Sequence, residues 1–248
     1  MIALLVCAVI AGQVPAATVM ILQAEPETGG ALVSRMLAKY VAAKRLRGQI
    51  IFLQRMDEKS LRTVTDLQAD WPSKLMIRQV QNGTRPVASV VTSDGTTFSY
   101  PVPEDLASRA NERLVESVEQ IGQRLDFRRI YAITGRSIID RSSALDIVIG
   151  RLDDLKFLRN QWATLTEMEG ANVPNCRSVG GQWREYGNAA VSGSYQMWID
   201  ANANLRRFAL TESIAIQAGQ PPKRIVSQWD VDVVVDGPVD AAMFTVIR

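Results

Sequence analysis

The stretch from Tyr195 to Arg207 constrains the fold of this chain more than any other. It reads YQMWIDANANLRR, an alternating strand followed by an Asp/Asn turn and a second strand that begins with two arginines. Asn82-Gly83 and Asp94-Gly95 separate further pairs of strand-like runs, and both dipeptides supply the positive φ that two-residue hairpin turns require. Strands joined by such short connections pair antiparallel. The sequence therefore predicts an antiparallel sheet.

Strand and helix patterns occupy separate parts of the chain. Apolar residues recur at helical spacing from Leu32, and strand-like runs then follow from Gln49 to Val80. Helical spacing dominates about 103–161, with the longest predicted helix from Pro103 to Phe127 and another pattern from Leu145 to Leu158. Strand patterns return in the last third. Because strands and helices do not alternate regularly, an α+β fold is favoured over a parallel α/β fold.

The N-terminal residues have the character of a secretion signal. Ile2 to Gly12 form an apolar run too short to span a bilayer, and Val14-Pro15-Ala16 are small residues of the cleavage-site type. We predict a signal peptide at 1–17, one domain over 25–248, and a periplasmic location. No Lys or Arg precedes the run and apolar residues resume at Ala17–Leu22, so an uncleaved N-terminal anchor that tethers the protein is the alternative.

Composition argues against several classes of function. The 28 basic and 26 acidic residues leave a formal charge of +2, too small a field to indicate nucleic-acid binding. The chain has no histidine, which removes Ser-His-Asp and Cys-His catalysis and the His-based zinc sites. It also lacks a phosphate-binding glycine loop. We therefore predict a protein that is not an enzyme, has no cofactor and does not bind nucleic acid.

Individual reactive or acidic residues have simpler structural interpretations. Cys176 is the only cysteine left if the signal is removed, and a buried structural cysteine is favoured over a reactive thiol. Asp200-x-Asn202-x-Asn204 imitates the start of a calcium loop, but Leu205 stands where glycine is needed, so a β-turn explains it better. Asp230 and Asp232 share one face of a strand, which is typical of a solvated face. No metal site is predicted.

Apolar residues on shared strand faces are the remaining candidates for function. They line a predicted cavity that could hold a hydrophobic ligand, and the same residues could equally fill an ordinary core of helix packed on sheet. The predicted ligand-binding residues are Ile50, Phe52, Leu67, Ile77, Phe98, Tyr100, Met197 and Ile199.

Several short motifs occur in an order that resembles a known family. They are Trp71-Pro72-Ser73-Lys74-Leu75, Ser93-Asp94-Gly95 leading to Tyr100, Cys176 to Trp183, and Trp198-Ile199-Asp200 to Arg206-Arg207. With the helix that begins at Leu32, they make the chain similar to the LolA-like superfamily of periplasmic lipoprotein carriers. The resemblance implies an unclosed antiparallel β-barrel, or half-barrel, whose apolar concave face is covered by helices that act as a lid.

The resemblance also implies a function. Family members hold acyl chains or hydrophobic peptide segments, so the expected partners are lipid or lipoprotein acyl chains and an inner- or outer-membrane protein that exchanges them. The alternative is a non-enzymatic envelope sensor or protein-interaction module on the same fold. A carboxylate-based enzyme is the least favoured hypothesis. The long, charged helical middle departs from the family pattern.

Overall fold

The computed structural model describes residues 27–82, 87–101, 113–120, 143–151, 166–168, 173–185, 188–215 and 221–246. The predicted signal peptide and anchor lie outside these ranges. The helices and strands are α1 (Gly29–Ala42), β1 (Arg45–Met56), β2 (Lys59–Asp70), β3 (Lys74–Asn82), β4 (Val87–Asp94), β5 (Thr97–Pro101), β6 (Arg113–Ser117), α4 (Ser143–Val148), β7 (Thr166–Met168), β8 (Cys176–Glu185), β9 (Asn188–Asp200), β10 (Leu205–Ile214), β11 (Lys223–Val235) and the 3-10 helix η3 (Ala241–Phe244).

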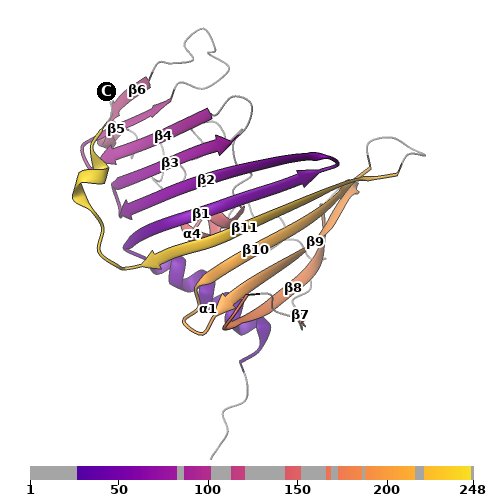
Figure 1. Ribbon diagram of the computed structural model, residues 1–248. Helices are drawn as coiled ribbons and strands as arrows, with labels where there is room; N and C mark the ends of the chain where they lie inside the picture. Colours follow the sequence, from indigo (N-terminus) through magenta and orange to yellow (C-terminus); the bar gives the residue numbers. More distant parts are fainter. Residues whose placement is uncertain are drawn as a thin grey trace, which may run out of the picture.

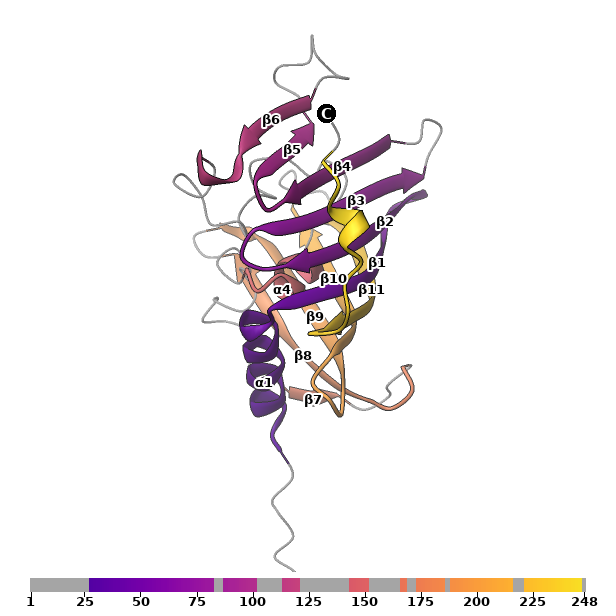
Figure 2. The ribbon, with the colours of Figure 1, turned by 90° about the vertical axis from the view of Figure 1, so that its left-hand side faces the viewer.

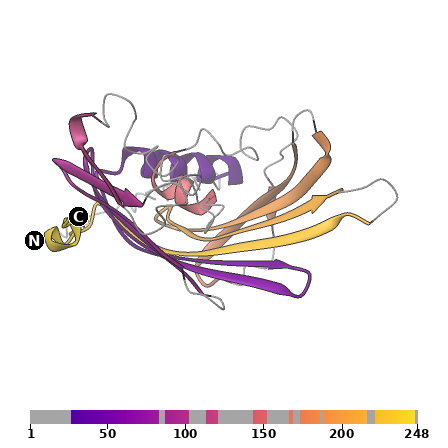
Figure 3. The same ribbon diagram turned by 90° about the horizontal axis from the view of Figure 1, so that it is seen from above.

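The strands form one eleven-stranded antiparallel sheet in the order β6-β5-β4-β3-β2-β1-β11-β10-β9-β8-β7 (Figure 1). Two meanders meet where β1 pairs with β11, in a register from Leu46 opposite Val235 to Met56 opposite Ile225. The sheet curves into a trough when seen from above (Figure 3). Among the described strands, the edge strands β6 and β7 are not paired with each other, so the barrel is open. The predicted α+β class and unclosed half-barrel are confirmed.

Alternation along the strands separates a concave from a convex face. On β11, Trp229, Val231 and Val233 are buried, whereas Asp230 and Asp232 point to the other face, as the strand period of two requires. Phe52 stacks on Trp229 with ring centroids 5.0 Å apart. These aromatic side chains place the centre of the hydrophobic core on the concave side.

Helices α1 and α4 lie inside the trough (Figures 2 and 3). The Oγ1 atom of Thr28 accepts a hydrogen bond from the Ala31 N–H and caps the N-terminus of α1. Leu32, Met36 and Tyr40 follow at intervals of four residues and are buried, so one stripe of the helix faces the sheet. The helix predicted from Leu32 is confirmed.

Helix α4 is short and ends in a well-defined cap. Gly150 has φ +74°, its N–H bonds the Ile147 carbonyl, and the Arg151 N–H bonds the Asp146 carbonyl. This pair of bonds is a Schellman motif, in which glycine adopts the left-handed conformation at little cost. Its apolar side chains are buried: Ala144, Leu145, Ile147, Val148 and, just beyond it, Ile149. The helical pattern predicted from Leu145 is confirmed as far as Val148.

The longest predicted helix is wrong over part of its length. Arg113–Ser117 is strand β6, which pairs with β5 so that Leu114 lies opposite Tyr100 and Glu116 opposite Phe98. The spacing of Leu106, Ala110, Leu114 and Val118 fitted a helix, but the free edge of β5 supplies backbone hydrogen-bonding partners that the local pattern does not reveal. Residues 103–112, 121–142 and 152–161 of the predicted helical middle, which include the end of the Leu145–Leu158 pattern, lie outside the described ranges.

The predicted two-residue turn at Asp94-Gly95 is longer than expected. Ser93 and Phe98 form the β4–β5 pair nearest the turn, so the residues from Asp94 to Thr97 are not paired between these two strands. Asp94 and Thr97 instead pair with the strands on their other sides, opposite Lys74 and Ser117. Asp94 Oδ1 accepts hydrogen bonds from the N–H groups of Thr96 and Thr97, and Gly95 has φ +99°. An aspartate that binds backbone groups two and three residues ahead stabilises this wider turn. Gly83 of the other predicted turn lies outside the described residues.

Candidate functional site

The eight predicted ligand-binding residues all lie on the concave face. They come from β1, β2, β3, β5 and β9, and the strand registers place them on one side of the sheet. Each is 5% exposed or less, and all belong to one hydrophobic core. The structure thus brings together side chains that are up to 149 residues apart in sequence, from Ile50 to Ile199. Their contact with a ligand stays a prediction.

Helix α1 is fastened to the turn between β9 and β10 by polar contacts. The Arg35 guanidinium donates to the Ala201 carbonyl at 3.3 Å. The Lys39 ammonium donates to the Asn202 carbonyl at 2.9 Å and to Asn204 Oδ1 at 2.6 Å. We call this region, α1 together with the turn Asp200–Asn204, the anchored end of the concave face.

Tyr40 completes the anchored end from inside the core. Its hydroxyl oxygen accepts a hydrogen bond of 3.1 Å from the Leu205 N–H, the first backbone group of β10. Both residues are buried, and burial raises the pKa of Tyr40 to about 12. A tyrosine held neutral in this way ties the last turn of α1 to the sheet.

Asp200 organises the turn itself. Its Oδ1 accepts hydrogen bonds from the N–H groups of Asn202 and Asn204, and its Oδ2 accepts one of 2.9 Å from Arg206 Nε. Burial raises the pKa of the Asp200 carboxyl, but the hydrogen bonds from Asn204 and Arg206 together lower it by more, so its pKa lies below the ordinary value. The β-turn predicted in place of a calcium loop is confirmed.

Polar side chains gather at the opposite end of the concave face. Gln54 Nε2 donates to Ser227 Oγ at 3.1 Å, and Ser227 is buried. Strand register places this pair beside the row that runs from β8 to β10 through Trp183, Gly193 and Glu212. We call this region the polar end of the concave face; its residues are Gln54, Trp183, Tyr195, Glu212 and Ser227.

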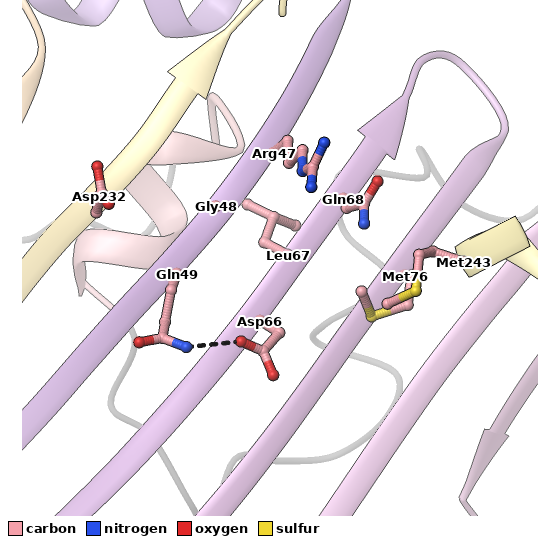
Figure 4. A pocket seen from close by; sticks show the side chains of 9 residues that line it. All are labelled: Arg47, Gly48, Gln49, Asp66, Leu67, Gln68, Met76, Asp232 and Met243. Atoms are coloured by element: carbon pink, nitrogen blue, oxygen red, sulfur yellow. Dashed lines mark hydrogen bonds between the residues drawn. The ribbon is translucent and has the colours of Figure 1, made fainter. Parts of the chain in front are cut away.

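A depression of about 390 Å³ lies on the convex face, away from the predicted cavity (Figure 4). Gln49 Nε2 donates to Asp66 Oδ1 across it at 2.8 Å. Beside it, the Asp240 N–H bonds Gln68 Oε1, which holds the C-terminal segment on the sheet. Its lining residues are Arg47, Gly48, Gln49, Asp66, Leu67, Gln68, Met76, Asp232 and Met243.

Two features that bear on metal binding and thiol reactivity can be read from the described part of the chain. Within it, no group of three or more His, Cys, Asp or Glu side chains lies close enough to hold a metal ion. Cys176 is only half-buried, which corrects the prediction of a buried cysteine; it stands at the start of β8, beyond the residues Ser178–Gly180 that pair with β7. Burial and the nearby Asp200 raise its thiol pKa, which disfavours the reactive thiolate.

The described helices show no membrane span. In the ranges given above, no helix combines the length and the apolar character needed to cross a bilayer.

Comparison with known proteins gives structural matches only. No protein-family model matches the sequence, and no curated protein does so. The MucA/MucB complex of Pseudomonas aeruginosa matches with 8% identity and a TM-score of 0.41, over 87% of this chain and 60% of that chain. This chain therefore spans about 60% of the length of the MucA/MucB chain that it matches.

Two further structures match over more of their own length. A LolA superfamily protein from Nitrosomonas europaea has 9% identity and a TM-score of 0.30, over 88% of this chain and 97% of that one. A putative outer membrane lipoprotein-sorting protein domain from Vibrio parahaemolyticus has 8% identity and a TM-score of 0.30, over 88% and 95%. These matches include the superfamily that the sequence motifs resemble. Because the TM-scores are below 0.5, function must be inferred from this chain's own residues.

Sequence reasoning identified the apolar floor of the concave face and missed its polar end. Trp183, Glu212 and Ser227 were recognised only as parts of strands. Their alternation with outward residues such as Arg184 and Gln228 places them on the inner face, but only the strand register shows that they lie side by side.

Proposed function

We propose that this protein binds the acyl chains of a lipid or lipoprotein on its concave face and carries them through the periplasm toward the outer membrane. The observation that supports this proposal is a continuous apolar face, assembled from both halves of the chain and covered in part by a helix of only six residues, α4. A face of this kind shields apolar groups from water without any catalytic group.

Helix α4 is suited to exchange with a ligand. It is far shorter than an isolated helix needs to be for stability in water, so its conformation depends on packing against its neighbours. The side chains of Leu145, Ile147, Val148 and Ile149 are at most 2% exposed, and their burial stabilises the covered state by roughly 6 to 12 kcal/mol. An acyl chain of about 14 carbons gains about 11 kcal/mol on burial. Replacing the buried α4 side chains by an acyl chain therefore changes the free energy of burial only a little.

Helix α1 has the opposite role in this proposal. Its contacts with the turn Asp200–Asn204 hold it on the sheet, so it forms a fixed wall of the binding face. A carrier needs such a division, because the fixed part keeps the fold intact while the exchangeable part releases the ligand.

The first test of the carrier proposal asks whether the purified protein contains a bound lipid. The chain is expressed with its N-terminal residues in a Gram-negative host, purified from the periplasm, and measured by native and denaturing mass spectrometry. We expect an acyl-bearing adduct in the native spectrum that is lost on denaturation. An empty protein that also fails to bind N-phenyl-1-naphthylamine, an uncharged apolar fluorescent probe, contradicts the proposal.

A matched pair of glycine variants tests whether α4 is the part that leaves the concave face when a ligand enters. Gly150→Ala strains the C-terminal cap of α4, because left-handed backbone costs a non-glycine residue about 1 to 2 kcal/mol. If α4 must leave for a ligand to enter, this strain tightens apparent probe affinity, by up to about tenfold. Gly95→Ala introduces similar strain at φ +99°, in the β4–β5 turn, and should leave affinity unchanged. Equal affinities in both variants contradict α4 as the exchangeable cover.

A protein-interaction module is the second candidate. It is favoured by one observation: all eight predicted cavity residues are at most 5% exposed, so the concave face is already filled. On this alternative, the purified protein contains no lipid, fails to bind the probe, and co-purifies with a stable envelope protein.

A further inference from the structure

The polar end of the concave face contains a hydrogen-bond donor that the fold does not use. Trp183 is 5% exposed, and in the part of the chain that the structure describes its Nε1–H has no hydrogen-bond partner. A buried donor without an acceptor costs about 1 to 3 kcal/mol. Such a group is rare in a folded protein and calls for an explanation.

Strand register places this indole N–H at the sheet surface of the trough. Trp183 lies opposite Gly193, and Gly193 lies opposite Glu212 on β10. A Cβ atom built on Gly193 would be only 2.8 Å from Trp183 Nε1, so the indole nitrogen lies directly over the glycine. Gly193 thus leaves room for the indole to extend over β9.

The surroundings of Trp183 change from polar to apolar along the strands. The next row inward pairs Gly181 with Tyr195, Tyr195 with Leu210, and Leu210 with Ser227. The row after that contains Val179, Met197, Phe208 and Trp229, all at most 1% exposed. The donor therefore lies at the border between a polar rim and the apolar floor. It is roughly 20 Å along β8 from Arg177, whose guanidinium donates to the Glu27 carbonyl just before α1.

We propose that the Trp183 Nε1–H is a subsite for the ester or amide carbonyl of an acylated ligand. This inference rests on the proposed carrier function and assigns the orientation of the ligand: acyl chain on the apolar floor, carbonyl at Trp183, and head group toward the polar end. The indole N–H of Trp183 is a donor only, and a carbonyl oxygen supplies the acceptor that it lacks. Every ester- or amide-linked acyl chain has such an oxygen at its first carbon. Pairing the two groups removes the cost of the unsatisfied donor.

The proposed subsite predicts that the protein prefers acyl esters to ethers of the same chain length. An ester and an ether of the same chain length bury nearly the same apolar area, but only the ester offers a carbonyl oxygen. A site with a buried donor binds the ligand that lacks the acceptor less well, because the donor then stays unpaired. We expect a five- to tenfold preference for the ester.

The test compares 1-palmitoylglycerol with 1-O-hexadecylglycerol as competitors for bound N-phenyl-1-naphthylamine. Wild-type protein should favour the ester by about five- to tenfold. Trp183→Phe keeps an aromatic ring and removes the N–H, so the ester-to-ether ratio should fall to about one. Trp198→Phe is the matched control, because Trp198 is also buried with an Nε1–H that lacks a partner in the described chain, but it lies on the convex face. Its ratio should equal that of wild type.

The outcomes separate the subsite from the carrier function. Equal binding of ester and ether by wild-type protein, or an unchanged ratio in Trp183→Phe, overturns the subsite and leaves the carrier proposal standing. A fall in the ratio with Trp198→Phe as well shows a general effect of losing an indole and also overturns it. Failure of wild-type protein to bind the probe or either lipid overturns the carrier proposal and the subsite together.

Discussion

The two ends of the concave face use polar groups in opposite ways. At the anchored end, Arg35, Lys39 and Tyr40 bond to backbone or side-chain groups of the β9–β10 connection, and Asp200 binds the backbone of its own turn. At the polar end, the N–H of Trp183 is buried and has no partner among the described residues. Polar groups that join two elements fix a structure, whereas an unsatisfied buried donor calls for an explanation, which we propose at Trp183 is a ligand carbonyl.

The two helices in the trough also differ in how they are held. Helix α1 combines a buried apolar stripe with hydrogen bonds to the sheet and the adjoining turn. Helix α4 presents buried apolar side chains and contacts α1 and β11. We infer that one helix belongs permanently to the half-barrel and that the other is the cover that a ligand displaces.

The largest expected effect comes from glycines at which two strands approach too closely for a side chain. A Cβ atom on Gly193 would lie 2.0 Å from the Thr211 carbonyl oxygen, and one on Gly48 would lie 2.0 Å from that of Asp232. Gly193→Ala and Gly48→Ala should each lower the free energy of unfolding by about 3 kcal/mol, measured by urea denaturation. Ser192→Ala, which adds no atom, should change it by less than about 0.5 kcal/mol. A change below about 1 kcal/mol in Gly193→Ala would show that β9 and β10 are not packed this closely at the polar end.

Removal of one hydroxyl tests the anchored end. Tyr40→Phe leaves the buried Leu205 N–H without an acceptor and should cost about 2 kcal/mol in free energy of unfolding. Tyr100→Phe is the control: its hydroxyl donates at 2.9 Å to Glu116, which is less buried and can turn to water, so about 0.5 to 1 kcal/mol is expected. Urea denaturation of both variants gives the two values. If Tyr40→Phe costs no more than Tyr100→Phe, the hydroxyl does not anchor α1.

The smallest effect concerns acid pH. The folded-state pKa of Asp200 is lowered, so its ionised form stabilises the fold above the ordinary aspartate pKa, and this contribution is lost as pH falls through the lowered value. Asp200→Asn should therefore lower the melting temperature by about 2 to 4 °C at pH 7 and flatten its decline between about pH 5 and 3. Asp232→Asn, whose side chain is 89% exposed, should leave the melting curve as it is. Thermal unfolding followed by circular dichroism measures both variants. If the melting temperatures of wild type and Asp200→Asn depend on pH in the same way, the Asp200 carboxylate does not stabilise the anchored end.

Local patterns predicted most of the elements that pack on the concave face. Alternation identified the strands that carry Ile50, Phe52, Met197 and Ile199, because a half-buried strand must alternate whatever its neighbours are. The same reasoning failed at Arg113–Ser117, where an accidental helical spacing was overridden by the open edge of β5. It also found Asp94-Gly95 as a turn but not its length, which depends on which side-chain oxygen binds the backbone.

The sequence by itself determined that the chain forms an antiparallel sheet with an apolar face, since side-chain alternation and turn residues are local properties. Only the tertiary structure decided that β1 pairs with β11, that α1 is fastened to the turn Asp200–Asn204, and that Trp183 lies over Gly193 with an unused donor. These features depend on the register between strands that are distant in sequence. Register is set by the packing of the whole core, and no short stretch of residues contains it.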